Sequence, residues 1–406
     1  MNTNNGPFLA AAATLLALAS LSSANAATCP VPAADYPTIQ AALNDAACDT
    51  VRVAPGRYFE NLRINRRVVL TGEDRDAVVI DGGRVAQGIL VRPRVFAVIA
   101  NLTVTNGFNR LDGAGVAGEN DSIVVLNGVR LTGNAARSGA GGYAGASSLF
   151  VLNSLIDNNI GGGLSAPPGS GPGRLVVLNT TLEGNVLSSP AVVYANELTM
   201  RDSVVRGNRG DDGVWFFEGS MQTTLVADNL IDTGACAVRV SERGTVQTST
   251  ITGNVSQIAG GVCNSAGQLT ISNSTITNNV GLSDAGGVSQ TFPANNVATT
   301  VQYSTIVDNV GPVGDSIGVA FGAVFVRASI IASETSGEGC RGVANGQVVS
   351  LGSNVATDDS CSLTRDSDQP NVADVGLAAL ADNGGPTPTH ALLPGSPAID
   401  SVGGSD

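Results

Sequence analysis

The sequence contains no lysine, a single histidine and few aromatic residues. All 21 basic residues are arginine, aromatic residues make up 4% and charged residues 14% of the 406 residues, and the formal net charge is −13. Without lysine, the chain has no side-chain amine for a Schiff base. Its negative charge argues against a nucleic-acid partner, because phosphate contacts need clustered positive charge. With 43% hydrophobic residues, the chain is not a disordered polyelectrolyte either.

Long apolar runs are confined to the N-terminus. Residues 8–21 are rich in Ala and Leu and precede Ala24-Asn25-Ala26, the small-x-small pattern that signal peptidase cleaves. We therefore expect residues 1–26 to be a signal peptide and the protein to be secreted, extracellular or at the cell surface. No later run reaches the ~18 apolar residues of a membrane-spanning helix. We expect a soluble protein with no membrane span after the signal is removed.

Six cysteines follow residue 26, and they form three sequence-local couples. The CxxC spacing of metal clusters is absent from the sequence. An even number of cysteines in an exported chain favours disulfides. Six cysteines permit 15 pairings, which sequence alone does not distinguish. The spacing favours Cys29 with Cys48, Cys236 with Cys263, and Cys340 with Cys361.

One phrase recurs along the chain and ends in asparagine. Two clear copies are LTISNSTITNN, ending at Asn279, and VQTSTITGN, ending at Asn254. The copies have a mean period of about 25 residues, which is typical of a solenoid. They end at Asn106, Asn134, Asn159, Asn185, Asn208, Asn229, Asn254, Asn279 and Asn309.

Alignment on this asparagine produces columns of one residue type. Aliphatic residues stand three and eight positions before it, and we expect both columns to face the core. A polar pair between them predicts a tight turn that joins two short strands, and stacked asparagines can bond along the stack. The first aliphatic column is Leu131, Ile156, Leu182, Val205, Val226, Ile251, Ile276 and Ile306; the second is Leu126, Val151, Val177, Met200, Met221, Val246, Ile271 and Val301. The polar pair contains a hydroxyl column of Ser154, Thr180, Ser203, Thr224, Ser249, Ser274 and Ser304, preceded by residues such as Asn153, Asn179, Asp202 and Asn273.

The period, the short strands and the β-branched residues predict an all-β solenoid, a parallel β-helix whose coils lie ~4.8 Å apart. A leucine-rich repeat has an overlapping period but requires a helical or extended convex side, where this chain has Gly, Ser and Asn. A propeller would need blades of about 40 residues or more. Apolar residues at positions 39, 42, 43 and 46 predict a capping helix over the first coil. Past Ile331 the repeat stops, and we expect an irregular C-terminal cap.

The C-terminal stretch contains Leu351-Gly352-Ser353-Asn354, then LADNGGPTPTH from residue 380 and LPGSPAID from residue 393. Over residues 329–400 it resembles the choice-of-anchor Q region of bacterial secreted β-helix proteins. The resemblance implies an exported protein, often tethered by a sorting signal, with no activity common to the family. The expected organisation is therefore a signal peptide (1–26), a parallel β-helix with its N-terminal cap (27–335) and a choice-of-anchor Q-like C-terminal segment (336–406).

Two shorter stretches resemble pectin-active families. Thr38-Ile39-Gln40, Pro55-Gly56-Arg57-Tyr58 and Leu70-Thr71-Gly72 are similar to the start of pectin methylesterases and other pectin-lyase-like folds. This resemblance implies a right-handed β-helix and concerns architecture only, because the esterase's catalytic signatures are missing. Gly210-Asp211-Asp212 resembles the paired-aspartate motif of polygalacturonases, but their Asn-Thr-Asp, Gly-His-Gly and Arg-Ile-Lys motifs are absent from the sequence.

A candidate glycan or calcium patch lies just after Asn208. The carboxylates of Asp211 and Asp232 stand at equivalent positions of consecutive coils, where they could hold Ca²⁺ or act as acid and base on a sugar. Its arginines could bind a uronate carboxylate, and the only tryptophan, expected to face outward, could stack on a sugar ring. The alternative is structural: corner charges paired across coils and an aromatic ring packed under a loop. The patch comprises Arg206, Arg209, Asp211, Asp212, Trp215 and Asp232.

Two further features have weaker interpretations. Residues 52–110 contain ten arginines and five acidic residues. They could meet an acidic polysaccharide, although arginines on an exposed coil usually serve solvation and edge protection. We expect His390, within the C-terminal stretch, to be a packed structural residue rather than a base.

The sequence thus predicts an exported, non-catalytic, monomeric β-helix protein of the cell surface or extracellular space, with a structural, adhesive or glycan-contacting role and no cofactor. Its expected partner is a polysaccharide or cell-surface glycan, not nucleic acid. The alternative is a Ca²⁺-dependent polysaccharide lyase, or another carbohydrate-active enzyme of the pectin-lyase-like fold. That enzyme would use Asp211, Asp212, Asp232 and Arg209.

Overall fold

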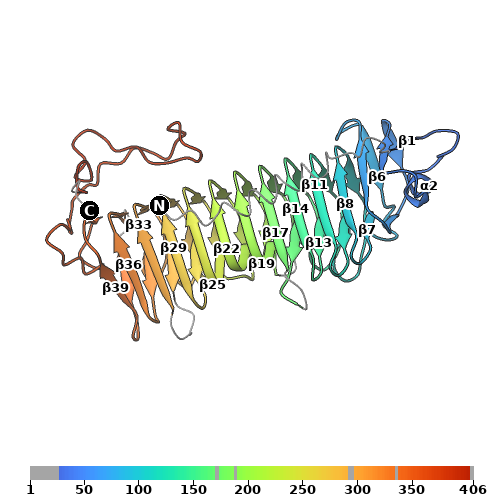
Figure 1. The fold of residues 1–406 in the computed structure, drawn as a ribbon. Helices are drawn as coiled ribbons and strands as arrows, with labels where there is room; N and C mark the ends of the chain where they lie inside the picture. The colour runs from blue at the N-terminus through green and yellow to red at the C-terminus, as the bar shows by residue number, and fades with distance from the viewer. Residues whose placement is uncertain (1–26, 170–172, 187–189, 291–296, 334–336, 403–406) are drawn as a thin grey trace.

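The chain winds into a long parallel β-helix whose coils follow one another along a single axis (Figure 1). The computed structural model describes residues 27–169, 173–186, 190–290, 297–333 and 337–402. The expected signal peptide, residues 1–26, lies outside the described residues. Each strand pairs in parallel with the equivalent strand of the next coil, as the period of about 25 residues predicts.

The largest sheet, sheet A, has 23 strands arranged as two strips that run along the solenoid. Three long strands, β19 (Ala191–Arg201), β22 (Asp212–Gln222) and β25 (Val238–Gln247), belong to both strips. The other strands of the first strip are β4 (Leu62–Ile64), β7 (Ile89–Val91), β10 (Val116–Gly118), β13 (Gly142–Ala144), β16 (Leu164–Ala166), β28 (Val262–Asn264), β32 (Val288–Gln290), β35 (Ile317–Val319) and β38 (Cys340–Gly342). Those of the second strip are β1 (Thr28–Val31), β2 (Thr50–Val53), β5 (Val68–Gly72), β8 (Phe96–Ala100), β11 (Ile123–Asn127), β14 (Ser148–Leu152), β17 (Arg174–Leu178), β29 (Gln268–Ser272), β33 (Ala298–Gln302), β36 (Ala323–Arg327) and β39 (Gln347–Ser350).

Two further sheets complete each coil. Sheet B has 13 strands and sheet C has four short ones. Sheet B consists of β3 (Gly56–Tyr58), β6 (Val78–Asp81), β9 (Thr103–Thr105), β12 (Arg130–Thr132), β15 (Leu155–Asp157), β18 (Thr181–Glu183), β20 (Val204–Arg206), β23 (Leu225–Ala227), β26 (Thr250–Thr252), β30 (Thr275–Thr277), β34 (Thr305–Val307), β37 (Ile330–Ile331) and β40 (Val355–Ala356). Sheet C consists of β21 (Arg209–Gly210), β24 (Leu230–Ile231), β27 (Val255–Ser256) and β31 (Val280–Gly281).

Both predicted aliphatic columns form the core. Every residue of the two columns is fully buried, and neighbours such as Leu131 and Ile156 pair in register on consecutive coils. Apolar burial of this kind contributes about 25 cal/mol per Å² removed from water. The alternation of inward and outward side chains along each strand explains why only every second position is constrained to be apolar.

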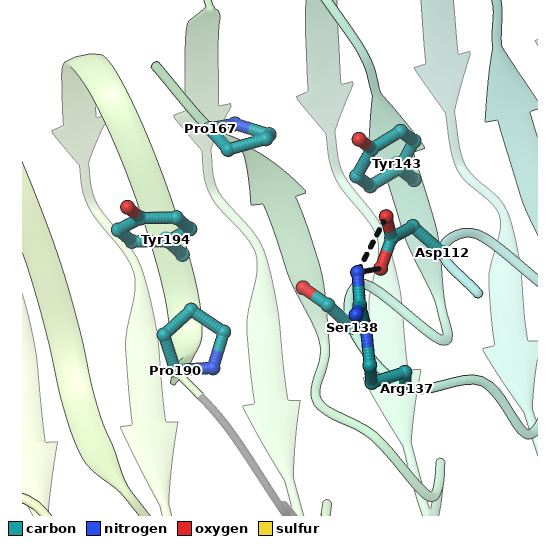
Figure 2. Close-up of a pocket in the computed structure, with 7 residues that line it drawn as sticks. All are labelled: Asp112, Arg137, Ser138, Tyr143, Pro167, Pro190 and Tyr194. Carbon is teal, nitrogen blue, oxygen red and sulfur yellow. Dashed lines mark hydrogen bonds and ion pairs between the residues drawn. The ribbon is translucent and has the colours of Figure 1, made fainter. Parts of the chain in front are cut away.

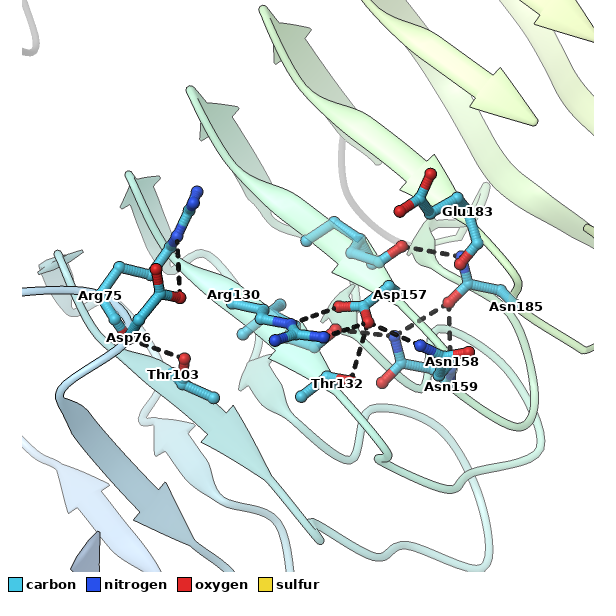
Figure 3. A network of polar contacts seen from close by, with 12 residues as sticks. Arg75, Asp76, Thr103, Arg130, Thr132, Asp157, Asn158, Asn159, Glu183 and Asn185 are labelled. Atoms are coloured by element: carbon cyan, nitrogen blue, oxygen red, sulfur yellow. Dashed lines mark hydrogen bonds and ion pairs between the residues drawn. The ribbon is translucent and has the colours of Figure 1, made fainter. Parts of the chain in front are cut away.

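The repeated asparagine forms a buried ladder inside the solenoid. Every side-chain amide of the ladder before Asn309 donates to the side-chain oxygen of the next coil, as from Asn159 Nδ2 to Asn185 Oδ1 at 2.9 Å (Figure 3). The same amide also donates to a backbone carbonyl, here Leu131 O at 2.9 Å. Because buried polar groups need partners, this ladder fixes where each coil turns. Its members, at most 2% exposed, are Asn134, Asn159, Asn185, Asn208, Asn229, Asn254, Asn279 and Asn309.

The first predicted copy is out of register by one residue. Asn106 donates to the carboxylate of Asp81, whereas the neighbouring Gly107 N–H donates to Asn134 Oδ1 at 2.9 Å. Gly107 therefore occupies the position equivalent to the ladder asparagines. The prediction that a repeat copy ends at Asn106 is therefore wrong by one residue, because Asn106 adopts a left-handed conformation (φ 53°) that turns it out of the core.

The predicted turn between sheet A and sheet B is present. Its first residue adopts the left-handed conformation, as in Asn153 (φ 52°) and Asn179 (φ 47°), which asparagine tolerates better than most residues. The following hydroxyl stabilises the turn: Ser154 Oγ donates to Leu152 O at 2.6 Å and accepts from Val129 N at 3.2 Å. A second, exposed ladder joins Asn153 Nδ2 to Asn127 Oδ1 at 2.9 Å.

An ion pair with a buried carboxylate links two coils on sheet B (Figure 3). The guanidinium of Arg130 donates twice to the carboxylate of Asp157, at 2.9 and 2.8 Å. Burial would raise the pKa of Asp157, but the hydrogen bonds from Arg130, Asn158 and Thr132 and the arginine's charge hold the pKa below its usual value. This pair illustrates how charged residues on the outside of the solenoid are neutralised by the next coil.

The N-terminal end is capped as predicted. Helix α2 (Ile39–Asn44) lies at the N-terminal end of the solenoid, and the Thr38 side chain accepts the Ala41 N–H at 3.1 Å as its N-cap. The helix buries Ile39 and Leu43 in the core. The carboxylate of Glu60 accepts the N–H groups of Ile39 and Gln40, both at 3.0 Å. The helix therefore covers strands that would otherwise expose a sheet end.

All three predicted disulfides are present, and no cysteine of the described residues is free. Each closes a short loop, of 19, 27 and 21 residues in sequence order. The first joins the cap to the first coil, and the last lies in the final coil. The pairs are Cys29–Cys48, Cys236–Cys263 and Cys340–Cys361.

The last coil extends to Ala356, into the segment expected to follow the β-helix. Strands β38, β39 and β40 pair with β35, β36 and β37. The chain beyond then turns back along the solenoid (Figure 1). An antiparallel pairing of Leu377 with Leu392 supports this return, and His390 packs there, with Nδ1 2.8 Å from Ala378 O and Nε2 3.2 Å from Thr277 Oγ1.

Within the described ranges, the model contains no helix of the length and apolarity that a membrane crossing requires.

Replacing Asn208 with alanine tests the ladder. Its Oδ1 accepts from the backbone and side-chain nitrogens of Asn185, at 2.9 and 3.0 Å, so the variant leaves two buried donors without partners. We expect Asn208→Ala to lower the free energy of unfolding by about 3 kcal/mol or more, measured by chemical denaturation. The control Asn153→Gly removes an exposed asparagine while keeping its left-handed turn, and it should cost about 1 kcal/mol or less. Equal losses in the two variants would contradict the role of the buried ladder.

Candidate functional site

The three long strands carry an outward column of large side chains. In the register of the sheet, Tyr194 on β19 lies beside Trp215 on β22, and Trp215 lies beside Arg239 on β25. The valine before each of them is buried in the core, and Phe216 is fully buried. Because successive side chains point to opposite faces, Tyr194, Trp215 and Arg239 face outward. The expected outward orientation of Trp215 is therefore confirmed.

Three aromatic rings form a platform on this face. The ring centroids of Tyr194 and Trp215 lie 4.8 Å apart, and those of Trp215 and Phe217 lie 5.8 Å apart with an interplanar angle of 23°. The indole Nε1 donates to Ser241 Oγ at 2.8 Å. This hydrogen bond and the neighbouring rings fix the orientation of Trp215 before any ligand arrives.

Arg239 covers one side of the platform. Its guanidinium carbon lies 4.3 Å from the centre of the Trp215 ring, which is a cation–π contact. Its Nε donates to Ser265 Oγ at 2.8 Å, and its Nη1 lies 3.6 Å from Asp212 Oδ2. Arg239 thereby connects the tryptophan to the acidic residue that begins the same strand.

Asp212 is a buried carboxylate, with a side chain that is only 2% exposed. Its Oδ1 accepts the backbone N–H groups of Ala235 at 2.7 Å and Cys236 at 2.8 Å. Burial raises the pKa of Asp212 to about 6, although the N–H groups and the charge of Arg239 act in the opposite direction. The negative charge of neighbouring Asp211 contributes to the rise. The Asp212 carboxylate, which lies beneath Arg239, consequently gains or loses its negative charge near pH 6.

The central disulfide holds the backbone that binds Asp212. Cys236 and Cys263 are fully buried and pack with Ala235 and Ala259 in a small apolar cluster on the outside of the main core. Cys263 belongs to the same outward column as Arg239, one coil further on. The disulfide therefore positions the two N–H donors that hold the carboxylate under the platform.

The column continues past Tyr194 into a hollow of about 290 Å³ (Figure 2). Arg137 and Asp112 form an ion pair across its floor, with Nη2 3.3 Å from Oδ1. Burial raises the pKa of Tyr143 and Tyr194, so both phenols stay protonated at neutral pH and can donate hydrogen bonds. The hollow is lined by Asp112, Arg137, Ser138, Tyr143, Pro167, Pro190 and Tyr194.

A second hollow, of about 400 Å³, lies on the other side of Tyr143. Arg92 and Glu119 line it and form an ion pair, with Nη1 2.8 Å from Oε2. Leu90 and Ala117 continue the outward column into this hollow. The two hollows and the platform follow one column along the first strip, and together we call them the aromatic groove. Its principal residues are Arg92, Asp112, Arg137, Tyr143, Tyr194, Trp215 and Arg239.

The six residues of the predicted patch do not lie together in the structure. Arg206 lies on sheet B and pairs with Glu183 at 2.8 Å, away from the groove. Arg209 pairs with Asp232 at 2.7 Å across two coils of sheet C. Asp211 accepts a hydrogen bond from Thr233. These three interactions match the structural interpretation, in which corner charges pair across coils, while Asp212 and Trp215 belong to the groove.

Four features of the groove were not predicted from the sequence: Arg239, Tyr194, Tyr143 and the Arg137–Asp112 pair. The strand register could have indicated that Arg239 and Tyr194 face outward. Each follows a residue of the buried valine column of the first strip, Val238 and Val193. Arg137 and Asp112 lie at coil corners, where the number of residues varies from coil to coil, so sequence spacing does not fix which corner side chains meet.

No group of three or more His, Cys, Asp or Glu side chains suited to a metal ion occurs in the described part of the chain.

A family model described as "Right handed beta helix region" matches residues 66–231. The protein folds as a right-handed parallel β-helix. No match was found among curated proteins.

Three solved structures illustrate the likeness in fold. The catalytic domain of a GH87 alpha-1,3-glucanase in complex with tetrasaccharides aligns at 14% identity, over 82% of this chain and 70% of that chain, with a TM-score of 0.48. The Azotobacter vinelandii mannuronan C-5 epimerase AlgE6 A-module aligns at 16% identity, over 76% and 90%, with a TM-score of 0.38. A mannuronic acid specific polysaccharide family 6 lyase from human gut microbiota aligns at 13% identity, over 79% and 85%, with a TM-score of 0.32.

The buried carboxylate predicts a distinctive pH dependence. The pKa of Asp212 is about 6 in the folded protein, against ~3.9 for an unfolded aspartate, so the folded state binds the proton more tightly. Its stabilising contribution is present below pH ~4 and is lost as pH rises through 6. Asp212→Asn keeps an oxygen acceptor but does not titrate. We expect its stability relative to the parent protein to increase from pH ~4 to pH ~7.5 by as much as about 3 kcal/mol, measured by chemical denaturation.

The control for this experiment is Asp211→Asn, which changes the partly exposed neighbour of Asp212. Because the Asp211 charge is the smallest of the named contributions to the pKa of Asp212, the stability difference of this variant from the parent protein should change with pH much less than that of Asp212→Asn. If Asp212→Asn behaves in the same way, the buried carboxylate is not what titrates.

Proposed function

We propose that this protein is an exported, non-catalytic β-helix protein that binds a polysaccharide in the aromatic groove. The observation that carries the proposal is the alignment of Tyr143, Tyr194 and Trp215 along one outward column, with polar side chains beside each hollow. Aromatic faces with polar edges suit sugars, which present both apolar ring faces and hydroxyl groups.

A repeating ligand suits a repeating surface. Neighbouring strands lie ~4.8 Å apart, so the column offers contacts at regular steps along the solenoid axis. The platform is also rigid, because it lies on strands rather than on loops and Trp215 is already hydrogen-bonded to Ser241. A polymer that lies along the groove can use several of these steps at once.

Export is supported by the disulfides and by one stretch of sequence near each end of the chain. Three disulfides within one chain are typical of an oxidising compartment. The apolar stretch of residues 8–21 and the choice-of-anchor Q-like stretch of residues 329–400 are consistent with a location outside the cell or at its surface.

The single tryptophan gives a direct test. Because Trp215 is the only tryptophan, its fluorescence reports the groove without labelling. We expect a polysaccharide from a panel of plant, bacterial and fungal glycans to change this fluorescence and to retard the protein in affinity gels. Tyr194→Ala should weaken binding about tenfold, which corresponds to ~1.4 kcal/mol, because it removes half of the closest ring pair.

The matched control is Phe59→Ala, which removes an aromatic side chain that is 73% exposed outside the groove. Its affinity should equal that of the parent protein. Trp215→Ala, followed in affinity gels, should abolish most of the retardation. Loss of binding in the Phe59 variant, or none in the two groove variants, would place the glycan elsewhere.

The enzyme alternative is tested in the same samples. Its carboxylates Asp211 and Asp232 are engaged by Thr233 and Arg209, and Asp212 is nearly inaccessible. We expect no shortened or unsaturated product when the glycan that binds is incubated with the protein, with Ca²⁺ or with a chelator. Product formation that Asp211→Ala abolishes would refute the non-catalytic role.

A further inference from the structure

The arginines of the aromatic groove are all engaged by acidic side chains of neighbouring residues. Three ion pairs lie in the groove, with N–O distances of 2.8 to 3.6 Å. They are Arg92–Glu119, Arg137–Asp112 and Arg239–Asp212. Each arginine is thus balanced by one carboxylate, and the groove has no excess of positive charge from these groups.

We infer that the polysaccharide held in the aromatic groove is a neutral glycan and not a polyuronate. This inference rests on the proposed function. A uronate that approached Arg137 would also meet Asp112, whose carboxylate lies 3.3 Å from the guanidinium. The repulsion between the two carboxylates would offset the attraction to the arginine. The ion pairs therefore act as a filter against acidic sugars.

The charge of the whole chain acts in the same direction. The net charge is −13 and lysine is absent, so the long-range field repels a polyanion before it reaches the groove. In the arginine-rich stretch of residues 52–110, at least five of the ten arginines pair with an acidic side chain, which reduces their attraction for a polyanion. Arg52 pairs with Glu73, Arg57 with Asp81 and Arg94 with Asp121.

The contacts that remain suit neutral sugars. The outward rings of Tyr143, Tyr194 and Trp215 offer apolar surface to a sugar, with Arg239 lying over one face of Trp215. The Asp112 carboxylate, with a side chain 23% exposed, can accept from a hydroxyl, and the Tyr143 phenol can donate to one. Such contacts do not require a charge on the ligand, and salt screens them little.

The experiment compares neutral glucans with polyuronates on the full chain. The probes are dextran and laminarin as neutral polymers, and polygalacturonate and alginate as acidic polymers, followed by Trp215 fluorescence and affinity gels. We expect binding to at least one neutral polymer, with an affinity that changes less than about twofold between ~50 and ~500 mM NaCl. We expect binding to both acidic polymers to be weaker by about tenfold or more.

A variant makes the filter itself testable. Asp112→Asn removes the carboxylate beside Arg137, and we expect it to raise the affinity for polygalacturonate about fivefold at low salt and thereby to raise the ratio of that affinity to the affinity for the neutral polymer. The matched control Asp76→Asn frees Arg75, whose ion pair with Asp76 at 3.7 Å lies outside the groove (Figure 3). It should not raise polyuronate affinity. Thermal unfolding of both variants verifies that they remain folded.

The outcomes separate the inference from the proposal on which it rests. Tighter binding of a polyuronate than of every neutral polymer by the parent protein would overturn the neutral-glycan inference and leave the glycan-binding role intact. An unchanged polyuronate affinity in Asp112→Asn would overturn the filter. No binding of any polymer by either method would overturn the proposed function and the inference with it.

Discussion

The structure depends on the in-register stacking of each coil on the one before. Parallel strands bond to their neighbours through the backbone, and from Asn134 to Asn309 the buried asparagine ladder adds a side-chain bond between successive coils, as between Asn208 and Asn229 at 2.9 Å. A slip by one residue would turn every inward side chain outward and leave buried amides without partners. Stacking therefore sets which residues meet on the surface, as well as which lie in the core.

The aromatic groove is a consequence of that constraint. Where β19, β22 and β25 run continuously through both strips of sheet A, the outward positions of three coils stand side by side with no corner between the strips. Tyr194, Trp215 and Arg239 meet there because their inward neighbours are held in one valine column. The same stacking brings arginines and acids of neighbouring coils into pairs, which sets the charge of the groove.

Much of the fold could be predicted from the sequence because its determinants repeat. A column such as Leu131, Ile156 and Leu182 is visible wherever the same chemical requirement recurs at the same interval. The register was misjudged only at Asn106, where the local conformation places Gly107 in the ladder position. The cysteine couples were predictable for a related reason, since residues about one coil apart in sequence lie close together in a solenoid.

Within the candidate site, the outward orientation of Trp215 could be predicted, since it follows from alternation along the strand. Its ion pairs could not be predicted. Arg209 with Asp232 and Arg239 with Asp212 are pairings of long side chains across coils, and their choice depends on side-chain conformation and on the corners between strands. The burial of Asp212, and with it the rise of its pKa, depends on the backbone that Cys236 holds in place.

The sequence by itself determined the coil period and the inward columns, because each follows from a local requirement that recurs along the chain, and its spacing favoured the disulfide couples. Only the tertiary structure decided which outward side chains share a surface and which charges neutralise one another. Those properties depend on distances of a few ångströms between coils. A surface side chain has several possible partners within reach, and sequence spacing does not tell which of them it contacts.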